Sequence, residues 1–315
     1  VSIVGTHLEK KFIKNLKKNY YHKTLKSYLP RKVKILDYQN LIDELRNRPD
    51  YVVIAVSSKG LDWVCKELIK NYDKKLSLIL LTKGLVNYNN KMVTISEKIN
   101  KLFQKNGLPK QDITSIKGPC LAAGLINKIR TSTVIANRNI ISAKKVERVI
   151  TTKYYKAETS KDIIGIEVLS AIKNLYAMLI GASLGLSGPN IQRNIRNKYY
   201  HNTSSSLFRE SLLEMKNFTV KMNGLQETTY GLAGLGDLYV SVAGGRNSKM
   251  GYYLGLGKKY QNIKRKEMKS ITTEGCELAL EIGPIIKKKF KRIQFPSLFA
   301  LIDAIRKNQK LKIKW

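Results

Sequence analysis

A long apolar segment with a lysine at its centre constrains this chain most. The segment runs from Asp162 to Gly188, reads DIIGIEVLSAIKNLYAMLIGASLGLSG, and carries Lys173 and Asn174. Two polar residues inside an apolar run of about 20 residues argue against a membrane span and favour a buried helix. Burial disfavours the ammonium form and lowers a lysine's pKa, which suits it to exchange a proton with a carbonyl oxygen. The alternative is a lysine at the helix edge that extends its ammonium into water.

The net charge is the most unusual property of the composition. There are 58 Lys and Arg residues against 23 Asp and Glu, so the formal net charge is +35. Such a field attracts anions: phosphorylated metabolites, nucleic acid or an anionic membrane face. Because the charge is spread along the whole chain, genome composition explains it most simply, a phosphorylated substrate comes next, and nucleic acid follows.

The cysteines and histidines indicate neither a disulfide framework nor a metal site. Three cysteines lie far apart, without CxxC spacing, and three histidines form no visible ligand set. With no signal peptide in the given sequence, we expect a reducing cytoplasm and no metal.

The order of expected elements predicts two domains. Residues 1–158 alternate short apolar runs with helical stretches, which is typical of a Rossmann-like parallel sheet with helices on both faces. Residues 159–315 are dominated by helical patterns, so an all-α domain follows. The predicted strands are 1–4, 34–36, 51–56, 76–82, 113–116 and 131–135, and the predicted C-terminal helices are 163–185, 203–222, 247–256, 273–289 and 297–307. We expect strand 51–56 to be a buried parallel strand, and a ligand to lie between the domains.

The opening VSIVGTHLEKKF is an incomplete version of a dinucleotide-binding turn. That turn calls for G-x-G-x-x-G after the first strand, but only Gly5 is present, and His7 and Lys10 take the other two glycine positions. No acidic ribose ligand is visible about 20 residues later. Either His7 or Lys10 contacts phosphate through charge, or the turn has no cofactor role.

Two further sets of residues point to an anion site. Ser57-Ser58, Lys83-Gly84 and Gly118-Pro119 each follow a predicted strand, and parallel strands end at one edge of a sheet. The Gly-rich segment 231–251 contains Asp237, placed to hold Lys173 by charge, and Arg246-Asn247 at a helix start, which suits an anion.

These motifs together resemble the NAD-dependent glycerol-3-phosphate dehydrogenase family, particularly its archaeal branch. The combination of E-x-x-x-A-x-K-N-x-x-A, G-L-x-G-x-G-D-L and a following R-N is specific, and the matches cover most of the chain in family order. The matching stretches are VVIAVSS, LILLTKGL, IKGPCLAAG, DIIGIEVLSAIKNLYA, ETTYGLAGLGDL, GGRNSKMGYYLGLG and TTEGCELA.

The resemblance implies an activity, a cofactor and a set of roles. NAD or NADP would serve the reduction of dihydroxyacetone phosphate to sn-glycerol 3-phosphate and its reverse, with Lys173 as general acid and base. The C-terminal domain would be of the 6-phosphogluconate dehydrogenase type, and a homodimer is compatible with it. Substrate contacts are implied for Lys83, Gly118, Asn174, Asp237, Arg246 and Asn247, and cofactor contacts for Gly5, His7, Lys83, Ala122, Arg246 and Glu274.

The chain also departs from the family pattern. His7 and Lys10 interrupt the glycine fingerprint, the segment between Asn19 and Arg31 is short, and Gly124 stands where a glutamate is usual. Two alternatives therefore stay open beside the dehydrogenase. One is a non-catalytic descendant that binds phosphorylated ligands, nucleic acid or an anionic membrane, and the other is a dehydrogenase of the same fold for another hydroxy acid.

Overall fold

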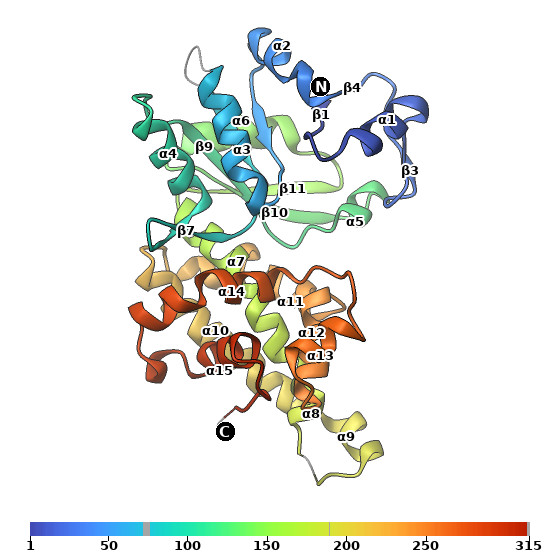
Figure 1. Ribbon diagram of the computed structural model, residues 1–315, viewed down its shortest axis with the longest axis vertical. Helices are drawn as coiled ribbons and strands as arrows, with labels where there is room; N and C mark the ends of the chain where they lie inside the picture. The colour runs from blue at the N-terminus through green and yellow to red at the C-terminus, as the bar shows by residue number, and fades with distance from the viewer. Residues whose placement is uncertain (72–75, 189, 314–315) are drawn as a thin grey trace.

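The protein consists of an α/β lobe followed by a helical lobe. The computed structural model describes residues 1–71, 76–188 and 190–313. Figure 1 shows the α/β lobe above the helical lobe, with α7 (Ile163–Gly181) leading from one into the other. The expected boundary between residues 158 and 159 falls within β11 (Tyr155–Ser160), the last strand before α7.

A five-stranded sheet forms the centre of the α/β lobe. Its strand order is β11-β10-β9-β6-β5. Helices α3 (Leu61–Lys70) and α4 (Ile95–Lys105) contribute to the apolar cluster on one face, and α6 (Ile140–Ile150) covers the other. The other strands are β5 (Val52–Ile54), β6 (Ser77–Leu80), β9 (Asp112–Lys117) and β10 (Thr131–Ala136).

A separate two-stranded parallel sheet carries the N-terminus. It joins β1 (Ser2–Val4) to β4 (Lys34–Leu36), and α1 (Lys10–Asn19) connects them. Gly5 is required at the turn between β1 and α1, because a Cβ there would lie 2.3 Å from Cγ1 of Ile13. Ile13 itself belongs to a small apolar cluster of this part of the lobe, which is distinct from the cluster under the main sheet.

Shorter elements complete the α/β lobe. Two of them, β7 and β8, form a hairpin whose turn residues Asn89 and Asn90 both have positive φ, of 51° and 58°. Such a pair of left-handed residues is typical of a tight two-residue hairpin turn. These elements are β2 (Tyr21–His22), β3 (Ser27–Tyr28), α2 (Leu41–Arg46), β7 (Leu85–Tyr88), β8 (Lys91–Thr94) and α5 (Ala122–Ile126).

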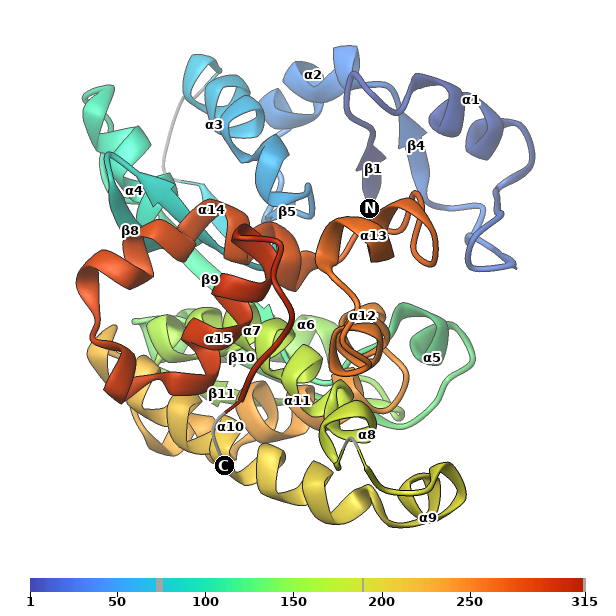
Figure 2. The ribbon, with the colours of Figure 1, turned by 60° about the horizontal axis from the view of Figure 1, so that its bottom comes forward.

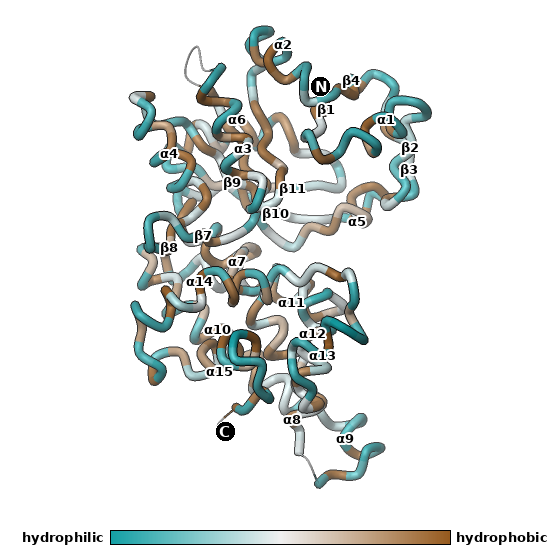
Figure 3. The backbone as a smooth tube through the Cα atoms, in the orientation of Figure 1, coloured by the Kyte–Doolittle hydropathy of each residue, from teal (hydrophilic) through white to brown (hydrophobic). Residues whose placement is uncertain are grey.

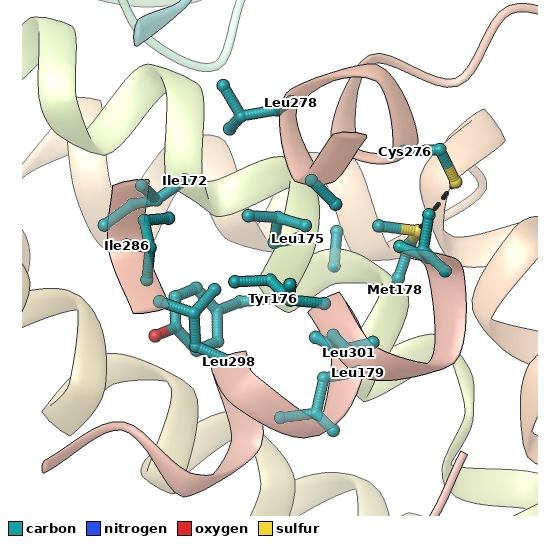
Figure 4. Close-up of a cluster of buried hydrophobic side chains, with 14 of the residues drawn as sticks. Ile172, Leu175, Tyr176, Met178, Leu179, Cys276, Leu278, Ile286, Leu298 and Leu301 are labelled. Atoms are coloured by element: carbon teal, nitrogen blue, oxygen red, sulfur yellow. Dashed lines mark hydrogen bonds between the residues drawn. The ribbon is translucent and has the colours of Figure 1, made fainter. Parts of the chain in front are cut away.

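The helical lobe is built around α7, as Figure 2 shows from below. Its apolar side chains pack against those of α14 and α15 in one cluster, part of which Figure 4 draws. The other helices are α8 (Ser183–Leu186), α9 (Arg193–Tyr199), α10 (His201–Lys221), α11 (Asp237–Val242), α12 (Arg246–Gly255), α13 (Tyr260–Arg265), α14 (Glu274–Lys289) and α15 (Pro296–Arg306).

By length and composition α7 could cross a membrane, but 94% of its most apolar window is buried inside the protein. Figure 3 shows hydrophilic residues along the outer rims of both lobes. A helix enclosed by its own protein needs no lipid, so the expected buried helix is confirmed.

The predicted Rossmann-like sheet followed by helices is also confirmed, with two differences in detail. First, β9 and β10 run antiparallel, so the main sheet is mixed. Second, strand 51–56 is parallel to β6 as predicted, but the expectation that it is buried was wrong for Val53, which is 52% exposed. The reason is that β5 is the edge strand of the main sheet. Among the described strands, β1 pairs with β4 and not with β5, so β5 has a neighbouring strand on one side only.

Candidate active site

Lys173 and Asp237 form a buried ion pair at the junction of the two lobes. The Lys173 Nζ lies 2.5 Å from Oδ1 of Asp237 and 2.8 Å from Oγ of Ser241, and it donates a hydrogen bond to each. Lys173 is 5% exposed and Asp237 is 3% exposed. Lys173 therefore does not extend into water at a helix edge, which excludes the alternative left open by the sequence.

The segment before Asp237 folds tightly because of its glycines. Residues Leu232–Gly236 form one π-helical turn that leads into α11, whose first residue is Asp237. A Cβ on Gly234 would lie 2.1 Å from the carbonyl oxygen of Thr229, so only glycine fits this turn. The turn aims the Asp237 carboxylate at α7, and a π-helical turn of this kind is frequent at functional sites.

Burial lowers the pKa of Lys173 from 10.5 to about 8. The charge of Asp237 opposes this shift, and the nearby ammonium of Lys83 adds to it. The physical reason is that the free energy lost when the ammonium leaves water exceeds the free energy gained from its attraction to a carboxylate that it shares with Lys83. At this pKa, Lys173 can both donate and accept a proton near neutral pH.

Lys83 occupies the loop between β6 and β7 and shares the same carboxylate. Its Nζ donates to Oδ2 of Asp237 at 3.2 Å, and its side chain is 31% exposed. One carboxylate thus holds two ammonium groups, one buried and one half-open to solvent. The pair of lysines with one aspartate leaves a net charge of +1, which favours an anionic ligand.

A chain of side-chain hydrogen bonds runs beside this ionic cluster. Asn247 Nδ2 donates to Oδ1 of Asn174 at 3.0 Å, and Asn174 Nδ2 donates to Oε2 of Glu274 at 3.0 Å. Oδ1 of Asn247 accepts from the backbone N–H of Gly275, also at 3.0 Å. Arg246 approaches Glu274 at 3.6 Å, while its side chain remains 60% exposed. The guanidinium is therefore positioned at the site and still open to a ligand.

Close contact between α7 and α12 brings Asn247 to Asn174. A Cβ on Gly251 would lie 1.8 Å from the carbonyl oxygen of Met178, and one on Gly181 would lie 2.2 Å from that of Ser248. Only glycine permits two helix backbones to approach so closely. The glycines of the α12 segment are therefore a packing requirement of the site.

The Gly118-Pro119 turn lies at the edge of this cluster. Gly118 follows β9 with φ of +140°, a conformation that favours glycine. A Cβ on Gly236 would meet Pro119 at 3.6 Å, which places the Gly118-Pro119 turn against the segment before Asp237. Ala122 begins α5 directly after this turn.

Gly5 and His7 lie in the N-terminal part of the α/β lobe, away from these contacts. The His7 ring packs against that of Trp63, with 5.2 Å between ring centroids. The backbone N–H of Thr6 donates to Oε2 of Glu9 at 2.9 Å. The structure thus joins Lys83, Lys173 and Asp237 in one ionic cluster, and Asn174, Arg246, Asn247 and Glu274 in a second set of contacts beside it. Gly5 and His7 make no contact with either set among the described interactions.

Sequence reasoning missed Ser241, although a signal was present. Ser241 follows Asp237 by four residues, and residues four apart lie on the same helix face.

Sequence reasoning also missed Asp37, which directly follows β4. Because β4 pairs in parallel with β1, Asp37 holds the position at which dinucleotide-binding folds carry an acidic residue. Sequence reasoning did not recognise Asp37 because more residues separate it from Gly5 than the usual spacing of about 20.

A buried pair behind the cluster was missed as well. Lys117 donates to the carbonyl oxygen of Leu80 at 2.9 Å, and Glu167 accepts from the backbone N–H and the hydroxyl of Ser96 at 3.1 and 3.0 Å. Burial lowers the pKa of Lys117 to about 7 and raises that of Glu167. Burial thus disfavours the charged form of both groups, while the attraction between Lys117 and Glu167 opposes both shifts.

The solvent-accessible cationic groups of Lys83 and Arg246 fit an anionic cofactor such as a dinucleotide. The turn after β1 fits it less well, because the Thr6 N–H already donates to the Glu9 carboxylate. Within residues 1–71, 76–188 and 190–313, His, Cys, Asp and Glu form no group of three or more that could hold a metal ion.

Comparison with known proteins identifies the family. A family model described as the NAD-dependent glycerol-3-phosphate dehydrogenase N-terminus matches residues 4–143, and the C-terminus model of the same family matches residues 162–313. Together they cover both lobes in order.

Curated relatives and a solved structure agree. The NADP(+)-dependent glycerol-3-phosphate dehydrogenase of Archaeoglobus fulgidus is 29% identical over 82% of this chain and 73% of its own length. The glycerol-3-phosphate dehydrogenase [NAD(P)+] of Clostridium perfringens is 30% identical over 69% of this chain and 61% of its own length. The crystal structure of glycerol-3-phosphate dehydrogenase from Coxiella burnetii superposes with a TM-score of 0.78 at 22% identity, over 98% of this chain and 88% of that one, and shows the same fold. By its sequence motifs and by both matched lobes, this chain belongs to the NAD-dependent glycerol-3-phosphate dehydrogenase family.

Proposed function

We propose that this chain is an NAD(P)-dependent glycerol-3-phosphate dehydrogenase that interconverts dihydroxyacetone phosphate and sn-glycerol 3-phosphate. The observation that carries the proposal is the buried Lys173 whose ammonium is held by Asp237 and Ser241. Family membership favours this activity over the non-catalytic alternative and over a dehydrogenase of another hydroxy acid.

The residues of the chain divide the work between proton transfer and binding. When bound, the nicotinamide supplies or accepts the hydride at C2 of the substrate. Lys173 donates a proton to the C2 oxygen during reduction and removes it during oxidation, while Asp237 and Ser241 keep its Nζ in one place. Holding the donor in place removes much of the entropic cost of the step.

Charge around Lys173 would bind and orient the substrate. Lys83 shares Asp237 and retains 31% exposure, so its ammonium can also donate to the substrate oxygen or phosphate. Arg246 presents five donors in a planar fork, the geometry that suits a phosphate. Asn174 and Asn247 would complete the polar wall beside them.

Replacing Lys173 tests the proposal. Lys173→Met keeps most of the side-chain volume and removes the proton donor, so we expect kcat to fall by about 10²–10⁴-fold. Lys98→Met is the matched control, because Lys98 is likewise buried but pairs with Asp62 in the α/β lobe. Turnover is followed through absorbance of the reduced nicotinamide, with circular dichroism to verify the fold. Wild-type kcat in folded Lys173→Met protein would overturn the assigned role.

We further propose that the protein works in the cytoplasm on a small phosphorylated substrate. All three cysteines, Cys65, Cys120 and Cys276, are free thiols. Unpaired cysteines are typical of a reducing compartment.

A further inference from the structure

A basic hollow lies on the α/β lobe, outside the network around Lys173. It has a volume of about 320 Å³ and lies between α1 and the segment that follows β4. The side chains that line it are those of Lys10, Lys14, Lys17, Asp37, Tyr38 and Gln39.

The three lysines occupy one face of α1. Their spacing of four and three residues places them along one stripe of the helix. Lys17 Nζ lies 3.0 Å from Oδ2 of Asp37, and Lys10 Nζ lies 5.7 Å from the centre of the Tyr38 ring. Lys14 is exposed and makes no ion pair or hydrogen bond with the described part of the chain. Its ammonium is therefore free for a ligand.

The charge of the hollow suits a phosphate monoester. Three ammonium groups against one carboxylate give a net charge of 3 − 1 = +2. A phosphate monoester carries about −1.5 to −2 at neutral pH, so the two charges match. Each lysine offers donors for charge-assisted hydrogen bonds to its oxygens.

The topology connects this hollow to a particular part of a dinucleotide. In dinucleotide-binding folds, the residues after the second parallel strand meet the adenosine ribose. Asp37 and Tyr38 hold that place here, because β4 is the parallel partner of β1. A free carboxylate at this place would accept the ribose 2′-hydroxyl and repel a 2′-phosphate, but Lys17 already pairs with Asp37.

We propose that the hollow binds the 2′-phosphate of the adenosine ribose through Lys10 and Lys14, with Lys17 neutralising Asp37, so that the chain prefers NADP(H) to NAD(H). The inference rests on the proposed function only in taking a nicotinamide dinucleotide as the cofactor. Lys17 neutralises Asp37, Lys14 meets the phosphate directly, and Lys10 reaches it from beside Tyr38. Because Glu9 already engages the Thr6 N–H, the 2′-phosphate supplies contacts that the altered turn withholds.

Two nucleotides that differ only in the 2′-phosphate test the proposal directly. Titration calorimetry of the wild-type chain with adenosine 2′,5′-bisphosphate and with adenosine 5′-monophosphate measures both dissociation constants without any turnover. We expect the bisphosphate to bind at least about tenfold tighter. Lys14→Gln and Lys10→Gln should each lower this ratio and change monophosphate binding little. NADPH and NADH should show the same preference.

A control separates the hollow from the general positive field. Lys11 and Lys18 are exposed on α1 but do not line the hollow. The Lys11→Gln/Lys18→Gln double variant removes more charge than either single variant, and its ratio should stay at the wild-type value.

Several outcomes would overturn the proposal: equal affinities, tighter monophosphate binding, no binding of either nucleotide, or an equal loss in the control variant. The turnover assay judges the proposed function separately. Turnover with NADH alone would support the dehydrogenase activity and reject the preference for NADP. Tight bisphosphate binding without turnover would support the 2′-phosphate site and reject the dehydrogenase activity.

Discussion

Asp237 influences the pKa of Lys173, and its single carboxylate is shared by two ammonium groups. Its two oxygens face different lysines, Oδ1 towards Lys173 and Oδ2 towards Lys83. The charge of Asp237 raises the pKa of Lys173, whereas burial and the Lys83 ammonium lower it, and burial contributes most. The balance keeps the Lys173 pKa near 8, which is close to the pH at which a general acid is most effective.

This balance predicts opposite pH profiles for the two directions. Reduction needs the Lys173 ammonium, so kcat/KM should be level below about pH 8 and fall about tenfold per pH unit above it. Oxidation needs the neutral amine, so its kcat/KM should rise through the same pH. Steady-state rates in both directions measure these two profiles. The range of pH 6–10 covers about two units on either side of the pKa.

Variants of the two neighbours serve as controls for this assignment. Asp237→Asn removes the charge that supports the ammonium and should move the inflection to lower pH. Lys83→Met removes a repelling charge and should move it to higher pH, although both variants turn over more slowly. If neither variant moves the inflection, the titrating group is not Lys173.

At the scale of the elements, Glu214 joins three helices through one buried carboxylate. It lies on α10, accepts the backbone N–H groups of Ser297 and Leu298 at 2.8 and 3.0 Å, and accepts the Tyr176 hydroxyl at 3.0 Å. The two N–H groups belong to the first turn of α15, whose N-cap residue Phe295 provides no side-chain hydrogen bond. Burial raises the pKa of Glu214, and the bonds from α15 oppose that shift.

Removing this carboxylate should loosen the helical lobe. Glu214→Leu leaves three buried donors without their acceptor, so we expect the free energy of unfolding to fall by about 2–4 kcal/mol. Glu214→Gln keeps one acceptor oxygen and should lose less. Urea unfolding measures both, with Glu210→Gln as the control, because Glu210 on the same helix forms an ion pair with the exposed side chain of Arg209. Equal stability of Glu214→Leu and wild type would show that α15 does not depend on this contact.

The same elements show where sequence reasoning works and where it stops. The strand around Leu78 and Ile79 was predictable because both its faces are buried, so its residues form a continuous apolar run. The β7–β8 hairpin was missed even though Asn89-Asn90 is a turn signal, because its flanking residues alternate weakly. The exposure of Val53 depends on which strand pairs with β5, and strand pairing is not encoded locally.

The candidate site divides in the same way. Lys173, Asp237 and Arg246 were predictable because each stands in a motif with a recognisable spacing. The contact between Asn174 and Glu274 spans 100 residues, so only the packing of α14 against α7 reveals it. Ser241 and Asp37 are single polar residues whose roles arise from what the fold places opposite them.

For the whole molecule, a net charge of +35 means that folding gathers mutually repelling groups. Salt screens that repulsion: the Debye length falls from about 30 Å at 0.01 M to about 8 Å at 0.15 M. We therefore expect Tm to rise by a few degrees across this range. Thermal unfolding in sodium chloride measures the rise, and potassium chloride controls for a specific cation effect. A falling or constant Tm would mean that local ion pairs outweigh the general repulsion.

The separate packing of the β1–β4 pair has an evolutionary consequence. Ile13, Leu16 and Ile35 form their own apolar cluster, apart from the clusters that support the main sheet and α7. The packing of this small cluster is therefore separate from the packing around α7, although His7 contacts Trp63, which packs against the cluster of the main sheet. The residues that support the β1–β4 pair can therefore change during evolution with little effect on the apolar packing of α7, which carries Lys173.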